Sequence, residues 1–160
     1  GFDITRSADR MKIVEISLGF DLVLSHAHSG HFEGQTLLLY ELYEAWKAAG
    51  KSGSIFHTGT SATFDPAEDF QRFAVIKYGA DVASRQISRA VQWGEVPFRL
   101  TNLRVGTLDT PTSRSRPQWP GQGIAPDVFV RTIEYIHALP MDHFVPEIVL
   151  LPKPGSEARR

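Results

Sequence analysis

The fold is decided by the stretch Ser54-Ile55-Phe56-His57-Thr58-Gly59-Thr60-Ser61, in which an apolar run passes directly into small and hydroxyl residues. A short, mostly apolar run is typical of a strand that is buried on both faces of a sheet. Small hydroxyl residues after such a strand lie at the carboxyl edge of the sheet, where open α/β folds bind ligands. The stretch therefore predicts a buried strand over residues 54–57 that leads into a binding site.

Strands and helices alternate on both sides of this stretch. Mostly apolar runs predict further strands, and apolar residues at helical spacing predict helices. The expected strands are Phe20–Leu24, Phe98–Val105 and Glu147–Leu151, and the expected helices are Glu33–Ala49, Pro66–Trp93 and Asp127–Ile136. Gly1–Thr5 is similar to the tail of a strand, and Thr110–Pro126, rich in Pro, Ser and Thr, is expected to be a long loop. The alternation predicts an α/β fold with a mainly parallel sheet, in one domain over residues 1–160.

The composition predicts a soluble globular domain. Apolar residues make up 42% of the 160 residues and charged residues 22%, as in ordinary folded proteins. Seventeen basic and eighteen acidic residues give a net charge of −1, and no basic block points to nucleic acid. No apolar run approaches the roughly 20 residues that span a bilayer, so we expect no membrane partner. The absence of cysteine excludes disulfides and thiolate chemistry, which suits a cytoplasmic protein.

The candidate site residues follow one another along the chain at wide spacing. Thr60 is followed by Phe73 thirteen residues later and by Lys77 four residues after that. Residues four apart are neighbours on a helix, so Phe73 and Lys77 are expected on one face. Farther along, a turn at Val105-Gly106 leads to Thr110.

This order and spacing resembles the active-site line of the short-chain dehydrogenases/reductases. In that family a serine orients the substrate carbonyl, a tyrosine is the general acid or base, and a lysine lowers the tyrosine pKa and holds the nicotinamide ribose. Carried over by position, the catalytic residues are Thr60 at the serine, Phe73 at the tyrosine and Lys77 at the lysine. A phenyl ring has no proton to transfer, so Phe73 departs from the family pattern.

The resemblance also implies positions that meet NAD or NADP. Lys77 would hold the ribose, Thr58 would offer backbone near the nicotinamide, and Gly106 stands in the family's Pro-Gly turn. Thr110 would meet the cofactor carboxamide, and Asp3 the nucleotide end. Ala27 is the one match to the family's Asn-Asn-Ala-Gly turn, which here is Ser-His-Ala-His.

Other departures limit the activity that the resemblance implies. The Gly-rich turn that holds the pyrophosphate at a helix N-terminus is absent, and no room for it precedes Phe20. We therefore expect a divergent, N-terminally truncated member with a Rossmann-like sheet that lacks the first strands. The expected function is that of an NAD(P)-dependent oxidoreductase, weakly active or inactive, whose substrate would be a small alcohol or carbonyl compound.

Two alternatives stay open. Without the first strands, the edge of strand Asp21–Leu24 is uncovered and invites pairing with another chain, which predicts a non-catalytic, homo-oligomeric binding or assembly module. The family that the chain resembles usually forms oligomers through its two long helices. The second alternative is a metal site with hydrolase-like chemistry at His26, His28 and His31, three histidines in six residues after a strand. The preferred site contains no metal ion.

Overall fold

The chain folds around a single four-stranded parallel sheet with the strands in sequence order. The computed structural model describes residues 1–27, 30–31, 33–64, 71–94, 96–117 and 119–153. Each neighbouring pair of strands is parallel. The strands are β1 (Leu22–Ser25), β2 (Gly53–Thr60), β3 (Phe98–Val105) and β4 (Glu147–Leu150). The predicted α/β class and parallel sheet are confirmed, and β3 has the predicted bounds.

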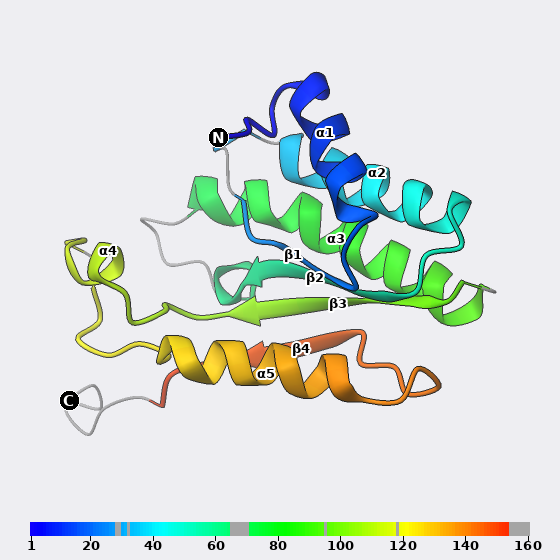
Figure 1. The fold of residues 1–160 in the computed structure, drawn as a ribbon. Coiled ribbons are helices and arrows are strands. Elements are labelled where there is room, and N and C mark those ends of the chain that lie inside the picture. Colours follow the sequence, from blue (N-terminus) through cyan, green and yellow to red (C-terminus); the bar gives the residue numbers. More distant parts are fainter. Residues whose placement is uncertain (28–29, 32, 65–70, 95, 118, 154–160) are drawn as a thin grey trace.

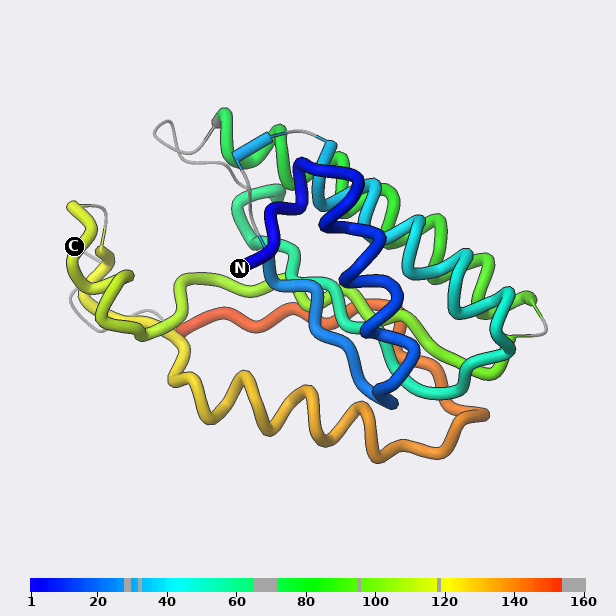
Figure 2. Tube along the Cα trace, turned by 45° about the horizontal axis from the view of Figure 1, so that its top comes forward, coloured from blue at the N-terminus to red at the C-terminus, as the bar shows by residue number. Residues whose placement is uncertain are grey.

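Helices cover the two faces of the sheet. On one face lie α2 (Gly34–Ala48) and α3 (Gln71–Trp93), with α1 (Ser7–Ser17) packed on α2, and on the other lies α5 (Pro126–Ala138) (Figure 1). Figure 2, turned by 45°, shows the same separation of α1, α2 and α3 from α5. The short helix α4 (Pro111–Arg114) and the 3-10 turn η1 (Ser61–Thr63) lie beyond the carboxyl ends of β3 and β2. Within the described residues no helix is long and apolar enough to cross a membrane.

Each face of the sheet has its own apolar core. Between the sheet and α2 and α3, the fully buried Trp46 packs with Leu39, Leu42, Ile55 and Leu100. The Trp46 indole N–H donates to Ser17 Oγ at 3.0 Å, which ties α1 to α2. On the opposite face, side chains of α5 pack against β2 and β3, namely Phe129, Ile133 and Ile136 against Phe56 and Leu103. Alternate residues of β2 and β3 therefore enter different cores, as the two-residue period of a strand requires.

Helix α1 is absent from the sequence prediction, and the strand tail expected at Gly1–Thr5 is wrong. Residues 1–3 form no regular structure, and the chain turns at residues 4–6 before the helix. In α1 the large apolar residues Met11 and Ile16 are exposed, whereas Arg10 is buried. Arg10 Nε donates to both carboxylate oxygens of Glu41, at 3.0 and 3.1 Å. Because two of its large apolar residues are exposed and one of its buried residues is an arginine in an ion pair, α1 shows no clear apolar periodicity. The sequence pattern therefore could not predict this helix.

The remaining differences concern a predicted loop and the ends of two elements. The segment expected to be a loop at Thr110–Pro126 contains α4, and its Ile124 pairs as an isolated bridge with Leu108. The long helix predicted from Pro66 is described from Gln71 onward, and residues 66–70 lie outside the described residues. Strand β2 runs to Thr60 and so includes three of the small residues expected to follow it.

Candidate functional site

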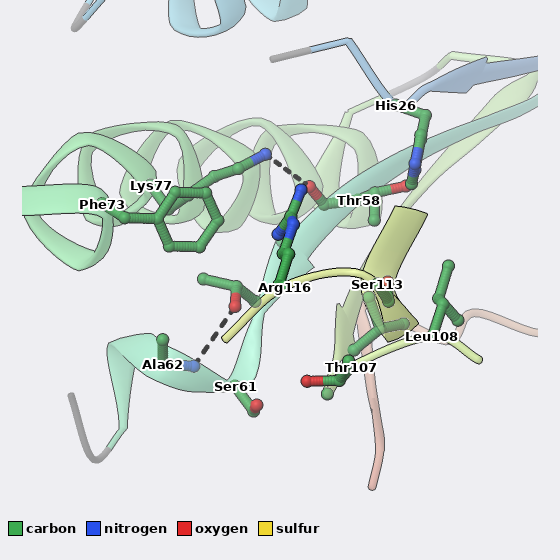
Figure 3. Close-up of a pocket in the computed structure, with 14 residues that line it drawn as sticks. His26, Thr58, Ser61, Ala62, Phe73, Lys77, Thr107, Leu108, Ser113 and Arg116 are labelled. Carbon is green, nitrogen blue, oxygen red and sulfur yellow. Dashed lines mark hydrogen bonds between the residues drawn. The ribbon is translucent and has the colours of Figure 1, made fainter. Parts of the chain in front are cut away.

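A pocket of about 410 Å³ lies at the carboxyl end of the parallel sheet (Figure 3). In parallel α/β sheets this edge is where ligands bind, because the loops that follow the strands meet there. Its walls come from the ends of the strands, from α3 and from the segment around α4. They are formed by residues 58–62, residues 105–108, His26, Phe73, Lys77, Ser113 and Arg116.

Lys77 brings a buried ammonium group to the wall of this pocket. Its side chain is only 5% exposed. Nζ donates to Gln35 Oε1 at 2.8 Å and to the Thr58 carbonyl oxygen at 3.2 Å, which leaves one of its three N–H donors. Burial lowers the pKa of Lys77 to about 8, and the nearby Asp81 carboxylate opposes that shift. Lys77 therefore stays protonated at pH 7 but is poised close to neutrality.

Phe73 lies beside Lys77, as their spacing on α3 predicts. The centre of the Phe73 ring is 6.0 Å from Lys77 Nζ, at the outer limit of a cation–π contact. Both side chains border the pocket and lie next to each other in Figure 3. Tyr78, the nearest phenol along the chain, is 53% exposed and is not part of the pocket wall. Phe73 therefore lies in the pocket wall at the position that the resemblance assigns to a tyrosine.

Thr58 and Thr60 belong to the same wall. Thr60 caps η1, since its Oγ1 accepts from the Ala62 N–H at 3.3 Å. Thr58 Oγ1 is buried and has no hydrogen-bond partner within the described residues. A buried hydroxyl without a partner is destabilising.

The predicted cofactor positions are only partly brought together. Gly106 borders the pocket, and its N–H donates to the Leu150 carbonyl oxygen at 2.8 Å. Thr110 caps α4 by accepting from the Ser113 N–H at 3.1 Å, and Ser113 rather than Thr110 faces the pocket. Asp3 and Ala27 are exposed and do not border it. The Asp3 carboxylate accepts from the Thr5 N–H and hydroxyl, bonds that lower its pKa.

The histidine cluster gives no support to a metal site. His26 borders the pocket, with its ring centre 6.1 Å from that of Phe129. Partial burial, and then the charge of Lys77, lower the pKa of His26. His28 lies outside the described residues. In the part of the chain that the structure describes, no three His, Cys, Asp or Glu side chains are placed to hold a metal ion.

A buried carboxylate beneath the pocket was missed by sequence reasoning. Asp81 lies one helical turn after Lys77 and has no exposed surface. Its Oδ2 is 2.9 Å from Thr63 Oγ1 and 3.8 Å from Arg104 Nη1, and its Oδ1 accepts from Asn102 Nδ2 at 3.4 Å. Burial raises the pKa of Asp81, and the bond from Thr63 is the largest opposing influence. The carboxylate fixes η1, whose first two residues form pocket wall.

His57 lies next to this carboxylate and is completely buried. Its Nε2 is 3.9 Å from Asp81 Oδ1, and neither ring nitrogen has a hydrogen-bond partner within the described residues. Burial, and then the charge of Lys77, lower the pKa of His57 to about 3, so the ring is neutral at pH 7. Gly59 makes room for the group, since a Cβ there would overlap Asp81 Oδ1. Apolar patterning carries no signal for such a cluster, because its members are polar residues that occupy core positions.

Comparison with known proteins identifies the fold. No family model matches the chain, and no curated protein matches it in sequence. Among solved structures, a "short chain dehydrogenase/reductase family protein" matches with a TM-score of 0.72 at 15% identity, over 98% of this chain and 75% of that one. The 3-ketoacyl-(acyl-carrier-protein) reductase from Brucella melitensis, complexed with NADH, matches with a TM-score of 0.71 at 13% identity, over 94% and 74%. The alcohol dehydrogenase from the archaeon Thermococcus sibiricus, complexed with 5-hydroxy-NADP, matches with a TM-score of 0.68 at 19% identity, over 93% and 72%.

The chain therefore has the fold of the short-chain dehydrogenases/reductases, as the sequence predicts. It spans about three quarters of the length of the solved structures that it matches. At such low identity the comparison establishes the fold, and function has to be argued from the pocket.

Proposed function

We propose that this chain is an oxidoreductase-like protein that binds the nicotinamide end of NAD or NADP in the pocket and acts weakly, or not at all, on a small alcohol or carbonyl compound. The observation that carries the proposal is Lys77, a buried ammonium at the carboxyl edge of a parallel sheet with one N–H donor left for a ligand. The matched reductase from Brucella melitensis is complexed with NADH, and the matched alcohol dehydrogenase from Thermococcus sibiricus with 5-hydroxy-NADP.

The pocket walls fit a nicotinamide and its ribose. The remaining N–H of Lys77 suits a ribose hydroxyl. At Gly106 a Cβ would lie 2.9 Å from Pro152 Cδ, so the glycine lets the segment after β4 pack closely beside the pocket.

Each pocket residue has a separate role in the proposed hydride transfer. The cofactor, when bound, supplies or accepts the hydride. Thr60 would orient the substrate carbonyl, Lys77 would hold the ribose, and the Phe73 ring would keep the space beside Lys77 apolar. The proton that accompanies the hydride has to come from water, because a phenyl ring has none. Loss of a positioned general acid costs on the order of 10²- to 10⁴-fold in rate, which accounts for the low activity that we propose.

Phe73→Tyr tests this account. The new phenol would stand beside Lys77, and reduction of small aldehydes and ketones by NADPH or NADH should accelerate about 10²- to 10⁴-fold. The measurement is the loss of reduced-cofactor absorbance over a panel of aliphatic and aromatic carbonyl compounds, for the wild-type chain and the variant.

Phe64→Tyr is the matched control, since it adds the same hydroxyl at an exposed ring that is not in the pocket wall. The control should leave the rate unchanged. If Phe73→Tyr binds cofactor and still shows no acceleration on any substrate of the panel, Phe73 is not what limits the reaction and the proposed role of the pocket is wrong.

A further inference from the structure

The charged groups that border the pocket are unbalanced. Lys77 and Arg116 are cationic there, and no carboxylate is among the pocket-wall residues that the structure describes. His26 is neutral at pH 7 because its pKa is lowered, so it adds no charge. The nearest acid along the loop, Asp109, is paired with Arg114 Nε at 2.5 Å. The described pocket wall therefore presents two cationic side chains and no carboxylate, although the buried Asp81 lies close to Lys77.

Arg116 is the more available of the two cations. It follows α4, and Figure 3 shows its side chain extending from that segment into the pocket, toward Thr58 and Lys77. Its side chain is exposed, and its guanidinium makes no hydrogen bond or ion pair with any described residue. A guanidinium has five N–H donors in a planar fork that matches the two oxygens of a carboxylate. An unpaired guanidinium directed into a pocket beside a second cation is thus arranged to receive an anion.

The other walls limit what that anion can be attached to. Phe73, Val105 and Leu108 give the pocket an apolar side suited to a carbon skeleton. A volume of about 410 Å³ is at the small end for ligand pockets, and the proposed nicotinamide occupies part of it. Only a short chain fits in the rest. Hydroxyl groups of Thr60 and Ser113 are available for a second polar group of the same ligand.

We propose that the pocket selects a short oxo acid or hydroxy acid, with Arg116 as the specificity-determining residue that binds the substrate carboxylate. As a statement about the reaction, this rests on the proposed function. As a statement about binding, it stands on the charge, direction and surroundings of Arg116. A bidentate, charge-assisted pair of this kind is stronger than a neutral hydrogen bond and discriminates against an ester of the same length.

Ligand binding without any nicotinamide cofactor tests the inference separately from the proposed function. The probes are 2-oxobutanoate and 4-oxopentanoate, each compared with its uncharged methyl ester, titrated into the isotope-labelled chain and followed by NMR. We expect at least one acid to bind about tenfold or more tightly than its ester, with shifts concentrated at residues 58–62 and 113–116. In Arg116→Gln the acid and the ester should bind within about twofold of each other.

Arg89→Gln is the matched control, because Arg89 is an exposed arginine of α3 that is not in this pocket wall. It should keep the wild-type preference for the acid. Equal binding of acid and ester by the wild-type chain, no binding of either, or a preference that survives Arg116→Gln would each overturn the inference. So would a loss of NADPH affinity in Arg116→Gln with the acid preference intact, since Arg116 would then serve the cofactor. Acid binding in a chain that fails to bind NADPH would uphold this inference while refuting the proposed function.

Discussion

Lys77 holds a positive charge where water scarcely reaches it, and this makes the stability of the fold depend on pH. The pKa of Lys77 is about 8 in the folded chain, against an ordinary value near 10.4 for an exposed lysine. Between these values the unfolded chain keeps a proton that the folded chain has released. Stability therefore rises with pH in that window, because the cost of the buried charge is removed as Lys77 loses its proton.

The pH dependence can be isolated by comparison with Lys77→Met, which cannot titrate. The free energy of unfolding of the wild-type chain minus that of the variant should increase by about 2–3 kcal/mol between pH 7.5 and pH 10.5, since one pKa unit corresponds to about 1.4 kcal/mol. Urea unfolding at several pH values measures it. A difference that stays flat across this range would mean that Lys77 is not desolvated in the folded chain.

At the residue scale, the sequence predicted the site residues whose positions follow from helical spacing. It did not predict those that only tertiary packing places at the pocket. Phe73 and Lys77 share a helix face because they are four residues apart. Arg116 was missed because a loop of Pro, Ser and Thr has no periodicity that fixes where its side chains point. None of Asp3, Ala27 and Thr110 borders the pocket. Their contact with a cofactor stays a prediction.

At the element scale, a glycine of β2 allows Asp81 of α3 to approach the strand closely. Gly59 lies on the face of β2 that meets Asp81, and a Cβ there would overlap the carboxylate. We expect Gly59→Ala to lower the free energy of unfolding by about 1–3 kcal/mol, the usual cost of overpacking a core. Chemical denaturation measures the loss.

A double-mutant cycle ties this cost to the carboxylate. In an Asp81→Ala background the closest overlap is removed and only that with Asn102 Oδ1, at 2.8 Å, remains. Gly59→Ala should therefore cost at least about 1 kcal/mol less than in the wild-type chain. Equal costs in the two backgrounds would show that Asp81 does not lie against Gly59.

The same buried groups explain which elements were predictable. Strand β3 was predicted with the bounds that the structure shows, although Arg99, Asn102 and Arg104 are all buried in it. Arg99 donates to the carbonyl oxygens of Ile136 and Leu139, and Arg104 Nε donates to Glu147. The sequence pattern sufficed to place the strand, but these partners of Arg99 and Arg104 lie 37 or more residues away along the chain. Helix α1 was missed for the same reason, because the ion pair of Arg10 is formed with a residue of α2.

At the scale of the whole molecule, one pocket at the carboxyl edge of a parallel sheet gathers most of the residues that the resemblance singled out. The edge strand β1 has no partner on its outer side among the described strands. Exposed apolar side chains lie on it and on the outer surfaces of α2 and α3, including Leu24, Tyr40 and Val75. These features suit the homo-oligomer that the sequence predicts, and that oligomer stays a prediction.

The measurement that tests the central claim most directly is a calorimetric titration of the chain with NADPH and with NADH. We expect one of them to bind the wild-type chain with a dissociation constant below about 1 mM. Lys77→Met should weaken that binding by about tenfold or more, as loss of a charge-assisted hydrogen bond predicts. Lys12→Met, which removes an exposed lysine of α1, should leave it unchanged. No binding of either cofactor up to millimolar concentration, or equal binding by the wild-type chain and Lys77→Met, would contradict a nicotinamide site built around Lys77.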